Sequence, residues 1–253
     1  PVVVWGRAHR DRRVGLHPSV GQREALRSGP AAGRSCRYGQ MVATETIAAD
    51  PATQLRITSR SGRVTVAAEQ RDDIVVPLGV EVSREAETIT VSADADAISV
   101  RVPEGLDLVI GTEGSRVDVT GPLGAVAIAT ASGRVSVEVA GSVDVRTTSG
   151  RVDIGVVGGA CRVRGESGRV TVDSCGTADV ATSSGRIRLA EVAGSVRAHC
   201  TSGRIDVGVR GSHPVAAETV SGRITVHLGR EVDPGIVVAR SVSGRVEVVQ
   251  DRR

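Results

Sequence analysis

Arginine is the residue in this chain whose spacing most suggests binding chemistry, because it recurs inside the tripeptide Ser-Gly-Arg. The tripeptide begins at Ser61, Ser132, Ser149, Ser167, Ser184, Ser202, Ser221 and Ser243. From residue 132 onward the copies begin 17, 18, 17, 18, 19 and 22 residues apart. Guanidinium groups bind carboxylates and phosphates through paired hydrogen bonds. We therefore predict an anion-binding or partner-binding ladder made of Arg134, Arg151, Arg169, Arg186, Arg204, Arg223 and Arg245.

Two interpretations of this ladder stay open. In the first, the arginines bind an extended polyanion, with the Ser-Gly amides helping to contact its oxygens, since like charges about 5 Å apart repel unless an anion lies between them. In the second, the guanidinium groups bond turn carbonyls and order the corners of the fold. Four acids two residues after an arginine could neutralise part of the ladder: Asp118, Asp153, Asp206 and Glu247.

Catalytic groups do not converge in this sequence. The five histidines are dispersed at positions 9, 17, 199, 213 and 227, and no G-x-S-x-G, P-loop or dinucleotide fingerprint occurs. Asp72-Asp73 and Asp94-Ala95-Asp96 read as acidic turns and lack the spacing of a calcium loop. We expect no catalytic residue, no metal site and no cofactor. With only Trp5 and Tyr38 as aromatic residues, specific binding of single-stranded nucleic acid is not expected.

The repeat also predicts the elements that position the arginines. A period of 17–19 residues suits one coil of a β-solenoid. Each arginine is followed by alternating apolar and polar residues, as in 135–139, and a second alternating segment follows glycine, as in 143–147. The fold class is therefore all-β: a single-stranded β-solenoid (β-helix) with 17–19-residue coils and two short strands per coil. The absence of Phe predicts a thin core of small aliphatic side chains.

The second strand of each coil carries charges of alternating sign at equivalent outward positions. These are Asp144, Arg162, Asp179 and Arg197 in consecutive coils. Stacked about 4.8 Å apart, they form a ladder of attractive surface pairs. We interpret this ladder as a device that holds the stacking register; partner binding is the alternative.

Three segments differ in composition. Residues 1–40 carry eight arginines against Asp11 and Glu24, a net +6 within a total of +3, so residues 41–253 carry −3. Because Met41 is the only methionine, we predict residues 1–40 to be a non-native or disordered leader; a basic arm for nucleic acid or an anionic surface is the alternative. Residues 41–113 form an irregular β-rich start, and residues 114–253 form the regular repeats.

Cysteine and hydropathy patterns bear on location. Cys36, Cys161, Cys175 and Cys200 have neither C-x-x-C spacing nor histidine partners, which indicates buried small hydrophobes in a reducing compartment. No apolar run approaches the roughly 18 residues that cross a bilayer, and no signal peptide is visible. We predict a cytoplasmic protein. The lack of Lys, Asn and Phe indicates a GC-rich bacterial genome.

The end of the repeat suggests a further function. No capping helix follows the valine-rich segment 246–249, and only Asp251, Arg252 and Arg253 blunt that edge. An uncapped edge can add another molecule strand to strand. A self-assembling, cytoskeleton-like filament, or a homo-oligomer formed through the C-terminal edge, is therefore an alternative.

A family resemblance supports the fold. The element from Val100 to Gly105, the residues Gly111 to Gly114 and the repeated strands of the form T-x-S-G-x-[VI]-x-V resemble the bacterial putative-adhesin β-strand repeat family, domain of unknown function 4097. The resemblance covers residues 44–250 and implies a right-handed solenoid-like fold with no catalytic residues to transfer. Members commonly have Asp where this chain has Arg after Ser-Gly. We predict a non-catalytic interaction or scaffold protein whose partner is an unknown protein or an anionic polymer.

Overall fold

Strands make up almost all of the described chain. The computed structural model describes residues 44–50, 52–93 and 96–250, so the predicted leader, residues 1–40, lies outside the described residues. The elements in chain order are β1 (Thr44–Ala48), β2 (Gln54–Glu69), β3 (Asp73–Pro77), β4 (Glu81–Glu85), β5 (Thr88–Ser92), β6 (Ala97–Pro103), β7 (Asp107–Thr130), β8 (Arg134–Val192), β9 (Val196–Val209), β10 (Val215–Leu228), the 3-10 helix η1 (Pro234–Ile236) and β11 (Val237–Gln250). The all-β prediction is confirmed.

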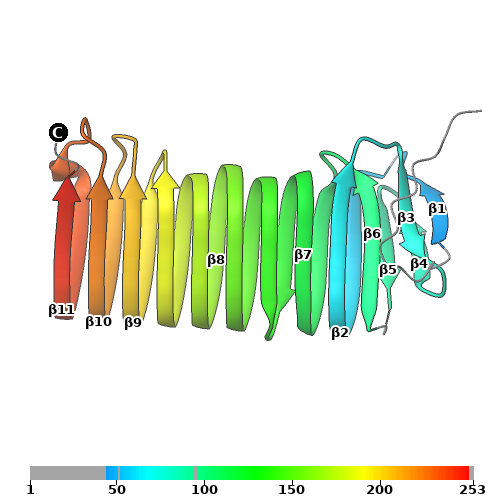
Figure 1. The fold of residues 1–253 in the computed structure, drawn as a ribbon, viewed down its shortest axis with the longest axis horizontal. Coiled ribbons are helices and arrows are strands. Elements are labelled where there is room, and N and C mark those ends of the chain that lie inside the picture. Colours follow the sequence, from blue (N-terminus) through cyan, green and yellow to red (C-terminus); the bar gives the residue numbers. More distant parts are fainter. Residues whose placement is uncertain (1–43, 51, 94–95, 251–253) are drawn as a thin grey trace, which may run out of the picture. The chain divides into compact units, whose positions relative to one another are not determined.

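Strands β7 to β11 pair in parallel, each with the segment about one repeat further along the chain. Ala178 pairs with Val196, Val196 with Val215, and Val215 with Val237. Figure 1 shows the ribbon from β7 to β11 passing through successive turns that lie side by side, several of them within β8. We call the segment from one Ser-Gly-Arg to the next a coil.

The core is a stack of small aliphatic side chains. Ile187, Ile205 and Ile224 are register partners on successive coils and are fully buried. Cys161 and Ala178 occupy equivalent inward positions on the other strand of their coils and are also buried. Because neighbouring coils repeat at strand spacing, about 4.8 Å, a larger ring in one coil would collide with the coils beside it. This packing explains the absence of Phe.

The Ser-Gly corner is set by one glycine and one hydroxyl. A Cβ on Gly168, whose φ is +132°, would lie 1.9 Å from the carbonyl oxygen of Gly150 in the preceding coil. Glycine is therefore required by the close approach of the coils as well as by φ. Two residues before the serine, Thr130 Oγ1 donates to the carbonyl of Ser132 at 2.8 Å, and Thr147 repeats this bond one coil later. The T-x-S-G pattern thus encodes a tight turn.

The irregular N-terminal part stacks in an order that differs from its sequence order. One edge of β2 pairs with β7, 53 residues later, whereas its other edge pairs with β5 and β6, 34 residues later. The sheet order is therefore β1-β3-β6-β2-β7, with β4 beside β5. The segment from β3 to β6 thus lies outside β2 rather than between β2 and β7. Alternation identifies the buried face of a strand but does not identify its neighbours, so this order could not be read from the pattern.

A loop covers part of the C-terminal coil. Val232, in the loop between β10 and β11, is only 3% exposed and joins the core. Gln250 Nε2 donates to the carbonyls of Arg230 and Val232 at 3.2 and 3.1 Å, which ties this loop to β11. This cover precedes the last strand in the chain, whereas the sequence showed only that no capping helix follows it. The charged residues expected to blunt the edge, 251–253, lie outside the described residues.

No helix within the described ranges is long and apolar enough to cross a membrane.

Candidate functional site

The predicted arginines share one register position on successive coils. Arg186 pairs with Arg204, Arg204 with Arg223, and Arg223 with Arg245. Through β8 the same register is carried by the adjoining glycines, since Gly150, Gly168 and Gly185 each lie against the glycine one coil before them. The coils repeat about every 4.8 Å. All seven predicted residues, Arg134, Arg151, Arg169, Arg186, Arg204, Arg223 and Arg245, therefore form one arginine column.

A groove runs along the middle of the arginine column. It has a volume of about 680 Å³ and is lined by Gly150, Arg151, Gly168, Arg169, Gly185, Arg186, Gly203, Arg204 and Arg223. The glycines have no side chains, so the groove exposes backbone between the guanidinium groups. Repetition of one short motif thus builds a shallow cationic channel across five coils.

The column arginines lack partners inside the described part of the protein. None of the seven has a side-chain hydrogen bond or ion pair among residues 44–50, 52–93 and 96–250. One coil before Arg134, at the same register position, Arg116 lies 2.8 Å from Asp118, and outside the column Arg164 forms two short bonds with Asp179. Neutralisation by the acid two residues along is therefore realised for Arg116 alone. The alternative in which column guanidinium groups bond turn carbonyls does not occur in the described residues.

Two backbone amides of the Ser-Gly-Arg corner are already committed. Ser149 N donates to the carbonyl of Ala131 at 2.9 Å, and Arg151 N donates to the carbonyl of Gly133 at 3.0 Å. These bonds join neighbouring coils and cannot also hold an anion. The amides of Ser149 and Arg151 are therefore not available to an oxyanion.

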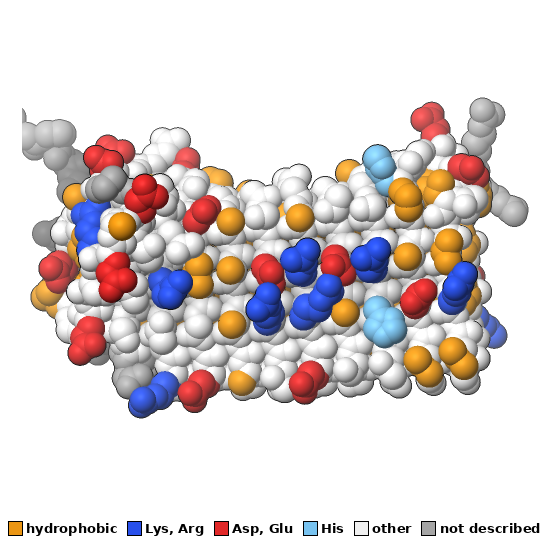
Figure 2. Space-filling view, turned by 180° about the vertical axis from the view of Figure 1, so that it is seen from behind, with side chains coloured by type: hydrophobic (Ala, Val, Ile, Leu, Met, Phe, Trp, Pro, Cys, Tyr) orange, Lys and Arg blue, Asp and Glu red, His pale blue; other side chains and the backbone are white. Residues whose placement is uncertain are grey.

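The opposite face carries the alternating ladder predicted from the second strands. Asp179 pairs in register with Arg197 and lies 3.8 Å from Arg162. Arg164 holds the same carboxylate at 2.6 and 2.9 Å, and this hydrogen bond is the main reason that the pKa of Asp179 is lowered. Figure 2 shows acidic and basic side chains gathered in rows across this face. Asp179 is thus paired with Arg164 and Arg162, whereas Asp144 Oδ1 is buried without a hydrogen-bond partner in the described residues.

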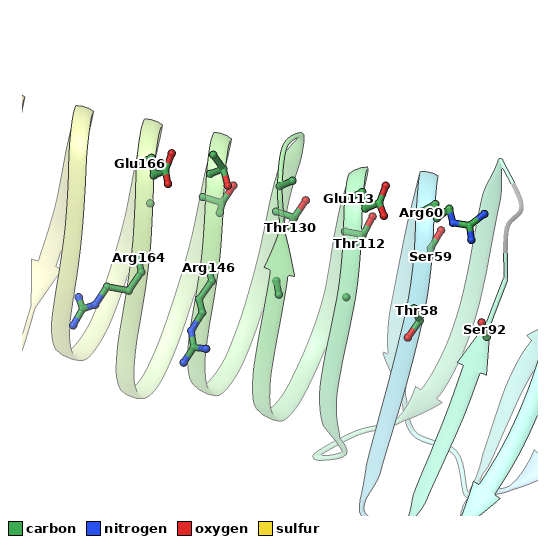
Figure 3. A pocket seen from close by; sticks show the side chains of 16 residues that line it. Thr58, Ser59, Arg60, Ser92, Thr112, Glu113, Thr130, Arg146, Arg164 and Glu166 are labelled. Carbon is green, nitrogen blue, oxygen red and sulfur yellow. The ribbon is translucent and has the colours of Figure 1, made fainter.

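A larger hollow lies at the corner that precedes Ser-Gly-Arg in β2 and β8 and Gly114-Ser115-Arg116 in β7. Its volume is about 850 Å³, and Thr112, Thr130 and Thr147 contribute hydroxyls to it. Figure 3 shows Arg146 and Arg164 extending away from Glu113 and Glu166. Arg60 and Glu113 line the same hollow on neighbouring coils.

Sequence reasoning missed this hollow. It exists because small residues, Gly111 and Ala129, occupy positions where the next coils carry Arg146 and Arg164. The change from small residues to arginines at this outward position was the sequence signal that could have predicted the hollow.

The described cysteines belong to the core. Cys161, Cys175 and Cys200 are buried free thiols, as predicted, and Cys36 lies outside the described residues. Burial raises the pKa of Cys161 to about 12, with a further contribution from Cys175, whose own pKa burial raises to about 11. Protonated thiols are poor nucleophiles and poor metal ligands. Among the described residues no group of three or more His, Cys, Asp or Glu could hold a metal ion.

The geometry defines an all-β protein in which parallel strands stack in register and repeat a charged corner. Comparison with known proteins agrees with this class. The model of the Toastrack DUF4097 family matches residues 40–252, and the chain belongs to that family. The resemblance stated from the sequence is therefore confirmed.

Solved structures show the same fold at low sequence identity. A putative adhesin from Parabacteroides merdae ATCC 43184 is 16% identical with a TM-score of 0.50, covering 82% of this chain and 95% of that chain. A putative adhesin from Parabacteroides distasonis ATCC 8503 is 13% identical with a TM-score of 0.50, covering 82% and 96%. No curated protein matches the chain. At these identities the likeness concerns the fold.

Proposed function

We propose that this chain is a non-catalytic interaction protein, a right-handed β-solenoid of 17–19-residue coils with two strands per coil, which presents the arginine column to an anionic partner. One observation carries the proposal: the column arginines have no carboxylate or carbonyl partner in the described residues, while arginines at other positions, such as Arg71 and Arg164, do. The partner is a protein or polymer that supplies the missing negative charge.

The physical reason is the repulsion within the column. Guanidinium groups on coils about 4.8 Å apart repel one another, although water and salt screen this repulsion. An anion lying between two coils turns this repulsion into two attractive contacts. Guanidinium forks suit carboxylate and phosphate oxygens equally well.

The non-catalytic part of the proposal is supported by the state and placement of the reactive groups. The pKa values of Cys161 and Cys175 are raised by burial, so these thiols stay protonated at neutral pH. His199 faces the register position of Glu218, whereas His227 faces that of Gly208, so the two imidazoles belong to different rows of the fold.

Cation-exchange chromatography of two matched variants tests the proposal. The column triple variant carries Arg151→Gln, Arg169→Gln and Arg186→Gln. The control triple variant carries Arg56→Gln, Arg101→Gln and Arg240→Gln, three exposed arginines outside the column. Both lose three charges, so a contiguous anion-binding column predicts that the column triple elutes at clearly lower salt. Elution of both variants at the same salt concentration contradicts the proposal.

Self-assembly through the C-terminal edge stays a prediction. Val238, Val242, Val246 and Val248 of β11 are all at least 40% exposed, and β11 is the last strand of the described sheet order. Light scattering at low and at physiological salt tests this alternative. A monomer in both conditions excludes a filament, and polymers that resist salt would move the functional site to β11. The cytoplasmic location also stays a prediction.

A further inference from the structure

The arginine column follows the stacking direction of the coils, and this geometry restricts what can lie along it. The five arginines of the groove, Arg151 to Arg223, occupy one register position on consecutive coils. Four steps of about 4.8 Å give a cationic line of roughly 19 Å parallel to the stacking direction. A matching ligand presents negative charge along a line of that length.

The groove floor favours a thin chain. Gly150, Gly168, Gly185 and Gly203 leave backbone exposed between the guanidinium groups. Each of these glycines lies against the carbonyl of the glycine one coil before it, so no side chain can fill the floor without displacing a coil. A slender polymer can settle into this channel and meet guanidinium groups from several coils at once.

The described residues disfavour nucleic acid as that polymer. Single strands are held by aromatic side chains on which bases stack, and the only aromatic residues, Trp5 and Tyr38, lie outside the described part of the chain. A duplex winds its phosphates around its own axis, so a column that follows the stacking direction meets only a few of them.

Charge spacing separates the remaining polymers. An extended acidic peptide presents side chains on one face every two residues, about 6.6 Å apart, which is longer than one coil step. Such a strand drifts out of step with the arginines after two or three coils. A condensed phosphate chain carries a negative charge on every phosphate, and its flexible links let each coil find one.

We propose that the segment of the column from Arg151 to Arg223 binds a linear phosphate polymer lying along the stacking direction, with at least one phosphate at each coil. The inference rests on the proposed function, because both need the column to bind anions. It adds the chemistry of the ligand, its direction and the length of chain that saturates the site.

Titration with inorganic polyphosphate of graded chain length, followed by calorimetry, tests the inference on the full chain. The affinity should rise with chain length until the polymer spans roughly 19 Å and then level off, after allowance for the number of overlapping sites on longer chains. The column triple should lose about tenfold or more in affinity, and the control triple less than about twofold. Thermal unfolding and circular dichroism of both variants establish that each is folded.

Poly-L-glutamate of matched charge is the second probe. We expect it to bind at least several-fold more weakly than polyphosphate. Equal affinity for the two polymers overturns the phosphate assignment and leaves the proposed function intact. An affinity that no longer rises beyond one or two phosphates overturns the lengthwise arrangement. Equal losses in the column and control triples overturn the proposed function as well.

Discussion

Replacement of Gly150 by alanine tests whether close approach of the coils, rather than flexibility, explains the repeated glycine. The new Cβ would lie 2.2 Å from the carbonyl oxygen of Gly133, at a φ of +144° that alanine rarely adopts. The carbonyl it meets is the one that accepts from Arg151 N at 3.0 Å. Strained backbone costs about 1–3 kcal/mol and a lost backbone hydrogen bond about 1 kcal/mol. We expect a loss of roughly 3 kcal/mol in the free energy of unfolding.

Gly165 offers a control fifteen residues away in the chain. A Cβ there would lie 3.5 Å from Thr147 Cγ2, an ordinary contact, and its φ is outside the left-handed region. Gly165→Ala should be neutral or should stabilise by about 0.5–1 kcal/mol, because alanine restricts the unfolded chain. Urea denaturation of both variants, followed by far-ultraviolet circular dichroism, gives the comparison. Equal changes in the two midpoints would refute the packing argument.

Three further predictions follow from the charges and thiols. The bond with Arg164 lowers the pKa of Asp179. The contribution of this ion pair to the free energy of unfolding is therefore fully present above pH 3.8, the ordinary pKa, and is lost as the pH falls through the lowered pKa. Asp179→Asn should therefore destabilise by less than about 1 kcal/mol at pH 7, and by progressively less as the pH falls below 3.8, measured by urea denaturation. The column triple variant should melt at the same or a higher temperature than the parent protein without anions, because repulsion is relieved; a clearly lower melting temperature, absent from the control triple, argues that the column is structural. Cys161 and Cys175 should react with a thiol reagent at pH 8 only after denaturation, as mass spectrometry of the labelled peptides can show, and rapid labelling of the native protein contradicts their burial.

The arginine column was predictable from sequence because a strict repeat places equivalent residues at one register position. Once one coil is assigned, Arg186, Arg204 and Arg223 must follow one another along the stack. The absence of ion-pair partners for these arginines was harder to predict from the sequence. Asp118 binds Arg116, but Asp153, at the same offset from Arg151, does not, and this difference depends on side-chain conformation.

The N-terminal stacking order and the cover at the C-terminal coil were not predictable in the same way. The pairing of β5 and β6 with the outer edge of β2 is a long-range choice that alternation does not encode. Val232 lies in a loop that the sequence marks only by a longer spacing between two Ser-Gly-Arg copies. Because the loop does not repeat, no periodic pattern predicted that Val232 is buried. Repetition thus specified the regular coils, and the ends, where repetition stops, required the structure.

The salt dependence of polyphosphate binding tests the central claim most directly. For a site that depends on several arginines, the logarithm of affinity falls linearly with the logarithm of salt concentration, with a slope set by the number of ion pairs formed. We predict that the column triple shows a slope smaller in magnitude by about two to three than the parent protein, while the control triple keeps the parent slope. Identical slopes for the parent protein and the column triple would contradict the assignment of the arginine column as the anion-binding site.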